Sequence, residues 1–365
     1  RGVEPTTRRR RLPPSARFPQ SMSLTLILCI ELLISFLFLR LASKRPKTAA
    51  FLALAIAAAA GVVYQKVFAV TVDGAGLVGR TTMKAAVFAP HLEQGVGFGE
   101  VPVPGHNDAQ MLLRVAAAGL NPSNYKVNPS MWPFVRFART WVIGYDVAGV
   151  VLSVGSSSSC NGFKVGDAVV GISSSGSIAE FSTVFCASVA HKSSKLGFTA
   201  AAGLPVAAMT TLGSYDRSFL KSGDHVLVIG ASGGCGIFGV TMGKALGAHV
   251  TGICSSRNVD FVRKLGADAV IDYTRPEEMR KFLKSGPQFD VIYDTVTSFA
   301  PEDPDYEPDT RPLLKPGGRY IAINGAVSDW ARMFVDQVTK PFGIRAQRPG
   351  YELFLLPPSR GLMGR

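Results

Sequence analysis

Apolar and polar residues follow two different patterns after residue 83 of this chain. Up to about residue 205, short runs rich in Val and Ala are separated by Pro and Gly turns, which is typical of strands. The strands predicted there are residues 83–89, 111–120, 142–155 and 167–172. We therefore expect a small, mainly antiparallel β-domain in this part of the chain.

After about Pro205, apolar runs of strand length alternate with segments of helical period. The predicted strands are residues 225–230, 249–254, 269–273, 289–296 and 317–324, and the predicted helices are residues 235–247, 258–266 and 277–286. This alternation implies a doubly wound parallel sheet with its ligand at the carboxyl ends of the strands. The predicted fold class is therefore α/β, with a β-domain before the sheet.

The first 82 residues form a different kind of sequence, with an Arg-rich start and two apolar runs, residues 24–39 and 49–64. Each run has 16 residues, which is about 24 Å of helix against a bilayer core of about 30 Å. We expect membrane attachment through residues 24–64, in a mitochondrion or a plastid. A cleaved targeting leader, which would give a soluble organellar protein, and a buried soluble helix are the alternatives.

Charge adds one exclusion to this description. The whole chain carries a net charge of +13. Residues 1–82 hold twelve Lys and Arg against three acids, a net +9, which leaves only +4 for the other 283 residues. Because the excess belongs to the leading segment, we expect no nucleic-acid groove on the folded body.

The cysteines and histidines point away from a disulfide scaffold and from a metal centre. The five cysteines form no C-x-x-C pair and are odd in number, so reduced thiols are favoured. The five histidines show no spacing typical of zinc ligands. We therefore predict that the protein holds no metal.

The stretch "GASGGCG" is the strongest functional motif in the sequence. Gly230, Gly233 and Gly236, with the additional Gly234, lie between a predicted strand and a predicted helix. Glycines there let the backbone turn tightly and approach a pyrophosphate, which the free N–H groups of the helix N-terminus stabilise. This predicts a dinucleotide site; a glycine-rich turn without a ligand is the alternative.

The end of the next predicted strand indicates which dinucleotide binds. Proteins that bind NAD commonly place an acid there to hold the ribose 2′-hydroxyl. This chain instead has Cys254, Ser255, Ser256 and Arg257, beginning 18 residues after Gly236. Two hydroxyls and a guanidinium suit a 2′-phosphate, so the sequence favours NADP(H). The alternative is that Arg257 is only a solvated residue at a helix start.

With these residues in view, the chain resembles the medium-chain dehydrogenase/reductase superfamily. It is similar to the zinc-independent quinone oxidoreductases and alkenal reductases, and to the mitochondrial reticulon-interacting oxidoreductases of that branch. The resemblance rests on "GLNPSNYKV", "GYDVAGVV", "GDAVVG", "GLPVAAMTTLGSYD", "GASGGCG", "LGADAVIDYT" and "LLKPGGRYIAIN". Where zinc alcohol dehydrogenases carry Gly-His-Glu, this chain has Tyr145 and Asp146 after Gly144, which agrees with the prediction of no metal.

The resemblance implies a domain organisation and an active site between two domains. The expected domains are a leading segment (1–82), a GroES-like catalytic domain (83–205), a Rossmann NADP(H)-binding domain (206–325) and an incomplete return to the catalytic domain (326–365). The return is called incomplete because the family usually continues well beyond "YELFLLPPS". The expected oligomer is a homodimer.

The resemblance also implies positions for the cofactor-binding residues, each of which has a purely structural alternative. Asn121, Thr210 and Asn324 would lie near the nicotinamide. Ser232, Gly233, Gly234 and Cys235 would hold the pyrophosphate. Ser255, Arg257 and Tyr273, together with Ser256, would surround the 2′-phosphate.

The reaction that the resemblance implies is hydride transfer from NADPH to a quinone or an α,β-unsaturated carbonyl. Without a metal, the charge that develops on the substrate oxygen needs hydrogen-bond donors. Tyr125 and Lys126 of "NPSNYKV" are the candidates; that Tyr125 packs and Lys126 is solvated is an equal alternative. A non-catalytic NADPH-binding subunit or assembly factor that retains the fold is the second function class.

Overall fold

The computed structural model describes residues 72–88, 96–126, 141–298, 303–325, 329 and 350–353, except for the side chains of Tyr125 and Lys126. The chain divides into two compact units, residues 1–68 and 69–365, and every described residue belongs to the second. The apolar runs at residues 24–39 and 49–64 lie outside the described residues. Among the helices that are described, none has the length and apolar character needed to cross a membrane.

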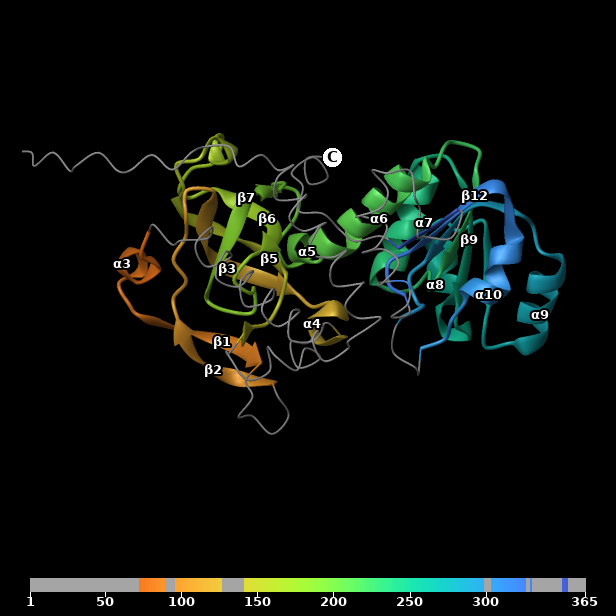
Figure 1. Cartoon of the computed structure of the whole chain (residues 1–365), viewed down its shortest axis with the longest axis horizontal. Coiled ribbons are helices and arrows are strands. Elements are labelled where there is room, and N and C mark those ends of the chain that lie inside the picture. The colour runs from red at the N-terminus through yellow and green to blue at the C-terminus, as the bar shows by residue number, and fades with distance from the viewer. Residues whose placement is uncertain are drawn as a thin grey trace, which may run out of the picture. The chain divides into compact units, whose positions relative to one another are not determined.

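The first half of the described chain forms a closed antiparallel barrel of strands β3, β5, β6 and β7, and a separate sheet in the order β2-β1-β4 (Figure 1). The bounds of these strands are β1 Thr82–Phe88, β2 Val96–Pro102, β3 Gln110–Gly119, β4 Trp141–Val142, β5 Asp146–Val154, β6 Ala168–Ser173 and β7 Phe181–His191. Apolar side chains of all four barrel strands fill one buried cluster, which includes Met111, Val147, Val169 and Val184. The barrel thus has its own core.

Short helices and turns connect the strands of this half. They are α3 (Gly74–Val78), α4 (Ser123–Lys126), η2 (Ser158–Cys160) and α5 (Phe198–Ala202). Helix α6 (Pro205–Ser218) then begins with Pro at its first position, where the missing N–H costs no hydrogen bond. This helix contacts strands of the barrel and also α7 and β12 of the second half.

The second half is a six-stranded sheet in the order β10-β9-β8-β11-β12-β13, and every neighbouring pair in it is parallel. Its strands are β8 His225–Ile229, β9 His249–Cys254, β10 Ala269–Asp272, β11 Phe289–Asp294, β12 Leu314–Ala322 and β13 Tyr351–Leu353. Its helical segments are α7 Gly234–Ala245, η3 Ser256–Asn258, α8 Val259–Lys264, α9 Pro276–Ser285, α10 Glu307–Thr310 and η4 Arg311–Leu313.

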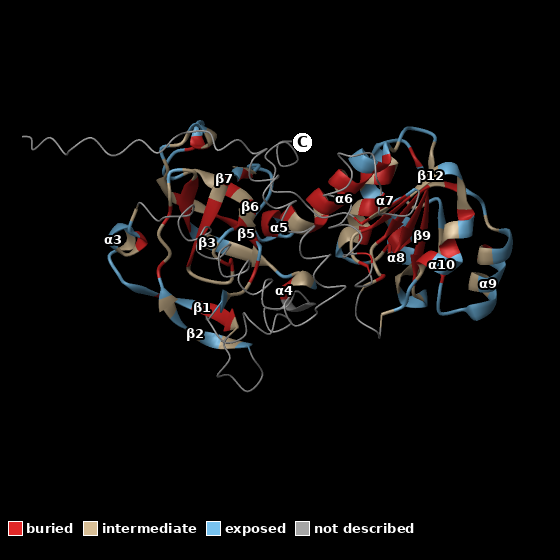
Figure 2. Ribbon diagram, viewed as in Figure 1, coloured by how far each residue is buried: buried red, intermediate tan, exposed pale blue. Residues whose placement is uncertain are grey.

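Alternate residues of the central strand β8 point to two separate cores, because side chains of a strand alternate between its faces. Val226 and Val228 join the core that contains residues of α6, α7 and α8. Leu227 and Ile229 join the core that contains Phe282 of α9. Strand β8 is therefore buried from both sides, as Figure 2 shows for the central strands of this sheet.

The expected fold class agrees with this architecture, although several of the described elements were not predicted. Strand β2, strand β7 and helix α6 have no counterpart in the sequence analysis. Residues 351–353, which belong to the predicted return to the catalytic domain, form β13 at the edge of the parallel sheet. The domain boundaries stay predictions.

One expectation about the cysteines is wrong. Cys160 and Cys186 form a disulfide, whereas the sequence predicted reduced thiols. Cys235 and Cys254 are free. The count and spacing of cysteines along the chain cannot show that η2 lies against β7, which is what brings the two residues to a Cα–Cα distance of 5.0 Å. Both residues are buried, with exposed fractions of 3% and 0%.

The disulfide should stabilise the barrel by limiting the freedom of the unfolded chain. Its two cysteines are 26 residues apart, so we expect the double variant C160S/C186S to lose about 3 kcal/mol of unfolding free energy. Denaturant unfolding of the wild-type chain with and without a reductant, beside the double variant, measures this. Equal stability of all samples would show that the bond contributes nothing.

Candidate functional site

The glycine turn between β8 and α7 is built from two glycines that the packing requires. Gly230 has a φ of +77°, and a Cβ there would lie 2.6 Å from Oγ1 of Thr295. A Cβ on Gly236 would lie only 2.0 Å from the Gly230 carbonyl oxygen. A side chain at Gly236 would therefore push α7 away from the end of β8, and one at Gly230 would collide with the residues that follow β11.

The other two glycines of the turn are less crowded, although a Cβ on Gly233 would lie 3.2 Å from the Gly230 carbonyl oxygen. Gly233 and Gly234 are exposed, and a Cβ on Gly234 would meet no atom within 4 Å. Gly233 is the N-cap of α7 and, having no side chain, makes no side-chain cap. The first N–H groups of α7 are thus available to an anion at the positive end of the helix dipole. This opening, which a side chain would fill, fits a pyrophosphate.

An asparagine that the sequence analysis did not single out joins the turn to the end of β9. The Nδ2 of Asn258 donates to Oγ of Ser232 at 3.0 Å and to Oγ of Ser255 at 3.3 Å. Ser232 of the pyrophosphate prediction and Ser255 of the 2′-phosphate prediction are therefore held by one amide. Nothing in the spacing of these residues indicated this contact.

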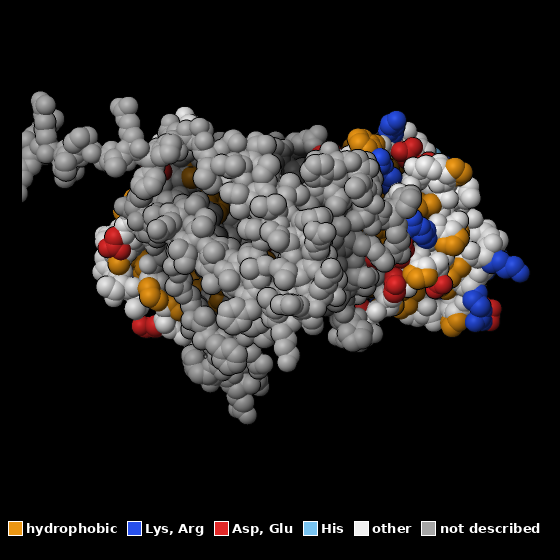
Figure 3. All heavy atoms as spheres, viewed as in Figure 1, with side chains coloured by type: hydrophobic (Ala, Val, Ile, Leu, Met, Phe, Trp, Pro, Cys, Tyr) orange, Lys and Arg blue, Asp and Glu red, His pale blue; other side chains and the backbone are white. Residues whose placement is uncertain are grey.

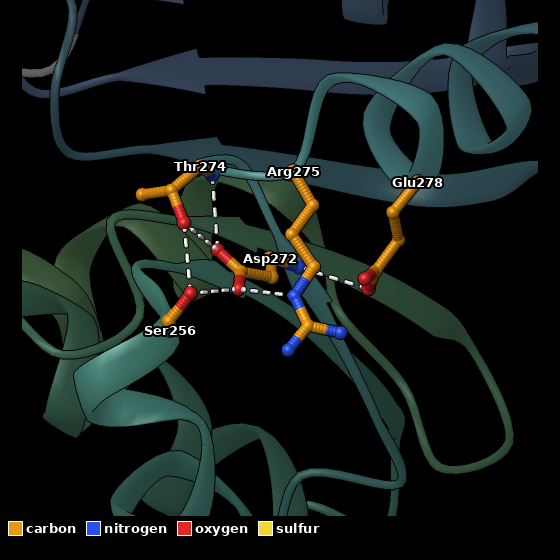
Figure 4. Close-up of polar contacts among 5 residues, drawn as sticks. All are labelled: Ser256, Asp272, Thr274, Arg275 and Glu278. Atoms are coloured by element: carbon orange, nitrogen blue, oxygen red, sulfur yellow. Dashed lines mark hydrogen bonds and ion pairs between the residues drawn. The ribbon is translucent and has the colours of Figure 1, made fainter.

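At the ends of β9 and β10 the structure shows an acid that the sequence analysis also missed. Asp272 pairs in register with Cys254, and its side chain accepts hydrogen bonds from the hydroxyls of Ser256 and Thr274 (Figure 4). The Nε of Arg275 lies 3.3 Å from Oδ2 of the same carboxylate. The Ser256 hydroxyl, followed by that of Thr274, lowers the pKa of Asp272, so the group is ionised at neutral pH.

This carboxylate changes what Ser256 can offer. Because the Ser256 hydroxyl gives its single proton to Asp272, that proton is engaged within the protein. Arg257 is exposed, and its guanidinium has no hydrogen-bond or ion-pair partner in the part of the chain that the structure describes. Tyr273 is 48% exposed. Of the residues predicted around a 2′-phosphate, Arg257 is thus the cation left for a ligand.

Near the start of α6, a buried carboxylate joins three segments of the chain. The Oδ2 of Asp146 accepts from Nδ2 of Asn121 at 2.9 Å, and its Oδ1 accepts from the backbone N–H of Val206 at 2.8 Å. Leu204, the N-cap of α6, provides no side-chain cap, so Asp146 supplies from β5 the acceptor that this helix start lacks. Asp146 itself is only 1% exposed.

Burial raises the pKa of Asp146 to about 6, and the hydrogen bonds from Asn121 and Val206 lower it in part. The charge of Asp146 also affects the pKa of Cys235 in the glycine turn. Burial raises the pKa of the Cys235 thiol to about 11, a contact with Tyr293 lowers it, and the charge of Asp146 raises it further. The thiol of Cys235 is therefore neutral at neutral pH.

Two other predicted cofactor residues have defined surroundings. Thr210 is buried on α6, with 7% of its surface exposed. Its neighbour Thr211, not Thr210, donates to the backbone, with Oγ1 at 3.0 Å from the carbonyl oxygen of Ala207. Asn324 follows β12, and its Oδ1 accepts from the N–H of Gly325 at 2.9 Å. The roles of Thr210 and Asn324 stay predictions.

The catalytic prediction cannot be placed in the same way. Tyr125 and Lys126 belong to α4, but their side chains lie outside the described part of the structure. Among the residues that are described, no group of three His, Cys, Asp or Glu side chains converges as metal ligands. The absence of a metal also stays a prediction.

Charges on the face shown in Figure 3 are mixed. Lys and Arg side chains alternate with Asp and Glu over the described surface in that view. Exposed ion pairs of the described chain include Arg280 with Glu277 and Arg263 with Asp260. The prediction that the folded body binds no nucleic acid is not tested by this view.

Taken together, the barrel, the doubly wound sheet and the open glycine turn define a dinucleotide-binding protein of two structural parts. The alcohol dehydrogenase GroES-like domain family matches residues 107–229, and the zinc-binding dehydrogenase family matches residues 234–328. The two matches together cover more than half of the chain, which belongs to the medium-chain dehydrogenase/reductase superfamily.

Individual relatives agree with this placement. The chain is 36% identical over 205 residues to the chloroplast envelope quinone oxidoreductase homolog of Arabidopsis thaliana, covering 53% of this chain and 61% of the relative. It is 31% identical over 247 residues to the chloroplastic NADPH-dependent alkenal/one oxidoreductase of the same plant, covering 64% and 60%. The chain thus spans about 60% of the length of these curated relatives.

A solved structure gives the same picture. The quinone oxidoreductase of Coxiella burnetii is similar with a TM-score of 0.62 and 28% sequence identity. The similarity covers 78% of this chain and 86% of that one. The likeness therefore extends over both structural parts.

The raised pKa of Asp146 predicts a pH dependence of stability that D146N should lack. Because the folded pKa of about 6 exceeds the usual value of 3.8, the folded state binds more protons than the unfolded state between these values. Stability from this group is therefore full below about pH 4 and is lost as the pH rises through 6, by about 3 kcal/mol. Denaturant unfolding of wild type and D146N across this range measures the difference, and a constant difference would contradict the prediction.

Proposed function

We propose that this protein is an NADPH-dependent oxidoreductase that transfers hydride to a quinone or an α,β-unsaturated carbonyl, without a metal. The observation that carries the proposal is the exposed start of α7 at Gly233 and Gly234, with Arg257 just past the end of β9 and without a hydrogen-bond or ion-pair partner among the described residues. The relatives support the substrate classes, since they include quinone oxidoreductases and an alkenal/one oxidoreductase that is NADPH-dependent.

In this proposal, different groups of residues bind different parts of the cofactor. The N–H groups at the start of α7, with Ser232, hold the pyrophosphate, and Arg257 with Ser255 and Tyr273 holds the 2′-phosphate. Asn121, Thr210 and Asn324 border the nicotinamide. The bound cofactor supplies a hydride from its reduced nicotinamide ring.

The protein's remaining task is to offset the negative charge that forms on the substrate oxygen. Preorganised donors do this well because they need no reorientation during the reaction. We assign this role to Tyr125 and Lys126 of α4, which the chain connects directly to Asn121. The second candidate function is that of a non-catalytic subunit or assembly factor, which would bind NADPH without oxidising it. The NADPH-oxidation assay described below distinguishes this function from that of an oxidoreductase.

The location is part of the same proposal. The two apolar runs at residues 24–39 and 49–64 support membrane attachment, and the chloroplast names of two relatives support an organelle. A cleaved leader remains the alternative, and a homodimer is the proposed oligomer. Alkaline extraction of organelle membranes, followed by detection of the full chain, would distinguish an integral from a released protein.

Removal of the Arg257 guanidinium should weaken NADPH binding selectively. A charge-assisted hydrogen bond to a phosphate contributes about 1.5 to 3 kcal/mol, so R257A should lose about ten- to a hundredfold in NADPH affinity and little in NADH affinity. Calorimetric titration of both nucleotides measures this, with R280A on the exposed face of α9 as the matched control. An equal loss for both nucleotides would contradict the assignment.

A negative charge placed in the glycine turn should abolish both binding and turnover. G233D would direct a carboxylate at the proposed pyrophosphate, so NADPH oxidation with an enone and with a quinone should fall at least a hundredfold. Gly197 is an exposed N-cap with open space around it, and G197D is therefore the matched control with the same charge. Undiminished activity in G233D would reject the phosphate site.

A further inference from the structure

The most informative feature beyond the glycine turn is the contact between Asp146 and Asn121. Asp146 is a buried carboxylate with no basic partner in the described part of the chain. A buried, unpaired acid is costly to a fold, because desolvation penalises its charged form. Helix α6 could be capped by a neutral side chain at lower cost. Capping of α6 alone therefore does not explain why this position carries an ionisable carboxylate.

The surrounding backbone is shaped so that this acid reaches Asn121. A Cβ on Gly119 would lie 3.0 Å from Oδ2 of Asp146 and 2.4 Å from the carbonyl oxygen of Ala202. Only a glycine at this position lets β3, the end of α5 and the Asp146 side chain approach together. The absence of a side chain at Gly119 thus allows the Asp146 carboxylate to reach the Asn121 amide.

Asn121 is fixed from its backbone as well as from its side chain. Its N–H donates to Oδ1 of Asn124 at 2.7 Å, and its carbonyl oxygen accepts from the N–H of Asn124 at 2.9 Å. Its Nδ2 donates to Asp146. The Oδ1 of Asn121 accepts no hydrogen bond from the described residues. The amide is therefore locked with its nitrogen toward the protein and its oxygen available.

Helix α6 relates this carboxylate to the glycine turn. Its Val206 N–H donates to Oδ1 of Asp146 at 2.8 Å, and its Thr211 donates to the carbonyl oxygen of Cys235, in the first turn of α7, at 3.1 Å. Asp146, which holds the Asn121 amide, and the start of α7 therefore both contact the first half of α6.

We propose that Asp146 is a positioning residue, which holds the Asn121 amide so that its oxygen accepts a hydrogen bond from the carboxamide N–H of the nicotinamide. This inference rests on the proposed function, because it requires a nicotinamide dinucleotide at α7. An ionised carboxylate has only acceptors, so it can receive both the Val206 N–H and the Asn121 N–H. It therefore excludes the opposite orientation of the Asn121 amide.

Replacement of Asp146 by Asn would remove that exclusion. An amide at position 146 must direct its oxygen to the Val206 N–H, and this turns its NH₂ toward Asn121. Asn121 would then rotate its own oxygen inward and present its NH₂ to the ligand. The Asn121 NH₂ would then face the N–H of the nicotinamide carboxamide, so that two donors meet and no hydrogen bond forms. Recognition of the carboxamide would be lost, whereas the fold and the packing of the apolar side chains would remain.

The test compares three ligands that bind without reacting. NADP⁺ carries the carboxamide, its 3-acetylpyridine analogue has a methyl group in place of the amide nitrogen, and adenosine 2′,5′-bisphosphate lacks the nicotinamide half. We expect wild type to prefer NADP⁺ over the analogue about tenfold, the effect of one hydrogen bond. D146N and N121A should lose this preference while binding adenosine 2′,5′-bisphosphate as wild type does. D309N, which changes an exposed acid of α10, is the matched control and should keep the preference.

The outcomes separate this inference from the proposed function. If D146N keeps the wild-type preference, or if wild type itself has none, the positioning role is overturned. N121A keeps the test decisive should D146N fail to fold, because an unchanged preference in N121A would show that Asn121 does not contact the carboxamide. Turnover of a quinone by wild type is assayed in parallel: binding with preference but no turnover removes only the oxidoreductase function, whereas no dinucleotide binding removes both.

Discussion

The close approach of α7 to the end of β8 is the constraint on which the rest of this structure depends. The Cα of Gly236 lies so near the Gly230 carbonyl that no side chain fits between them. This places the first N–H groups of α7 directly at the carboxyl edge of the parallel sheet, where β9 and β10 also end. An anion can therefore meet the helix dipole and the Ser255–Arg257 segment at the same edge.

The carboxyl edge of the sheet is not free of negative charge, although no acid directly follows β9. The segment after β9 has none, but Asp272 of the neighbouring strand reaches Ser256. Two hydroxyls and Arg275 surround that carboxylate, which keeps its charge compensated within the protein. Arg257 has no hydrogen-bond or ion-pair partner within the described part of the chain, so the proposed preference for a 2′-phosphate depends on this one guanidinium more than on the serines. The buried Asp146 at the start of α6 likewise has its role through the groups that it binds, the Asn121 amide and the Val206 N–H of that helix.

The sequence predicted what depends on local pattern. The parallel strands and their helices followed from apolar periodicity, β9 within its observed bounds, and the glycine turn followed from four glycines between a strand and a helix. Strand β7 was missed because its run "FSTVFCASVAH" mixes small polar and apolar residues. The Cys160–Cys186 bond, the Asn258 bridge and the Asp272 contact were missed for one reason. Each joins residues that only the folded sheet or barrel brings together, and no spacing along the chain records that. The roles of Tyr125 and Lys126 remain where the sequence left them, because their side chains lie outside the described structure.

The central claim is that an adenine dinucleotide with a 2′-phosphate binds at the start of α7. Calorimetric titration of the full-length wild-type chain with NADPH and, separately, with NADH tests this most directly. The structure predicts one site that binds NADPH at least about tenfold more tightly than NADH, as expected when one charge-assisted phosphate contact distinguishes them. Equal affinities, a preference for NADH, or no heat with either nucleotide would contradict the account.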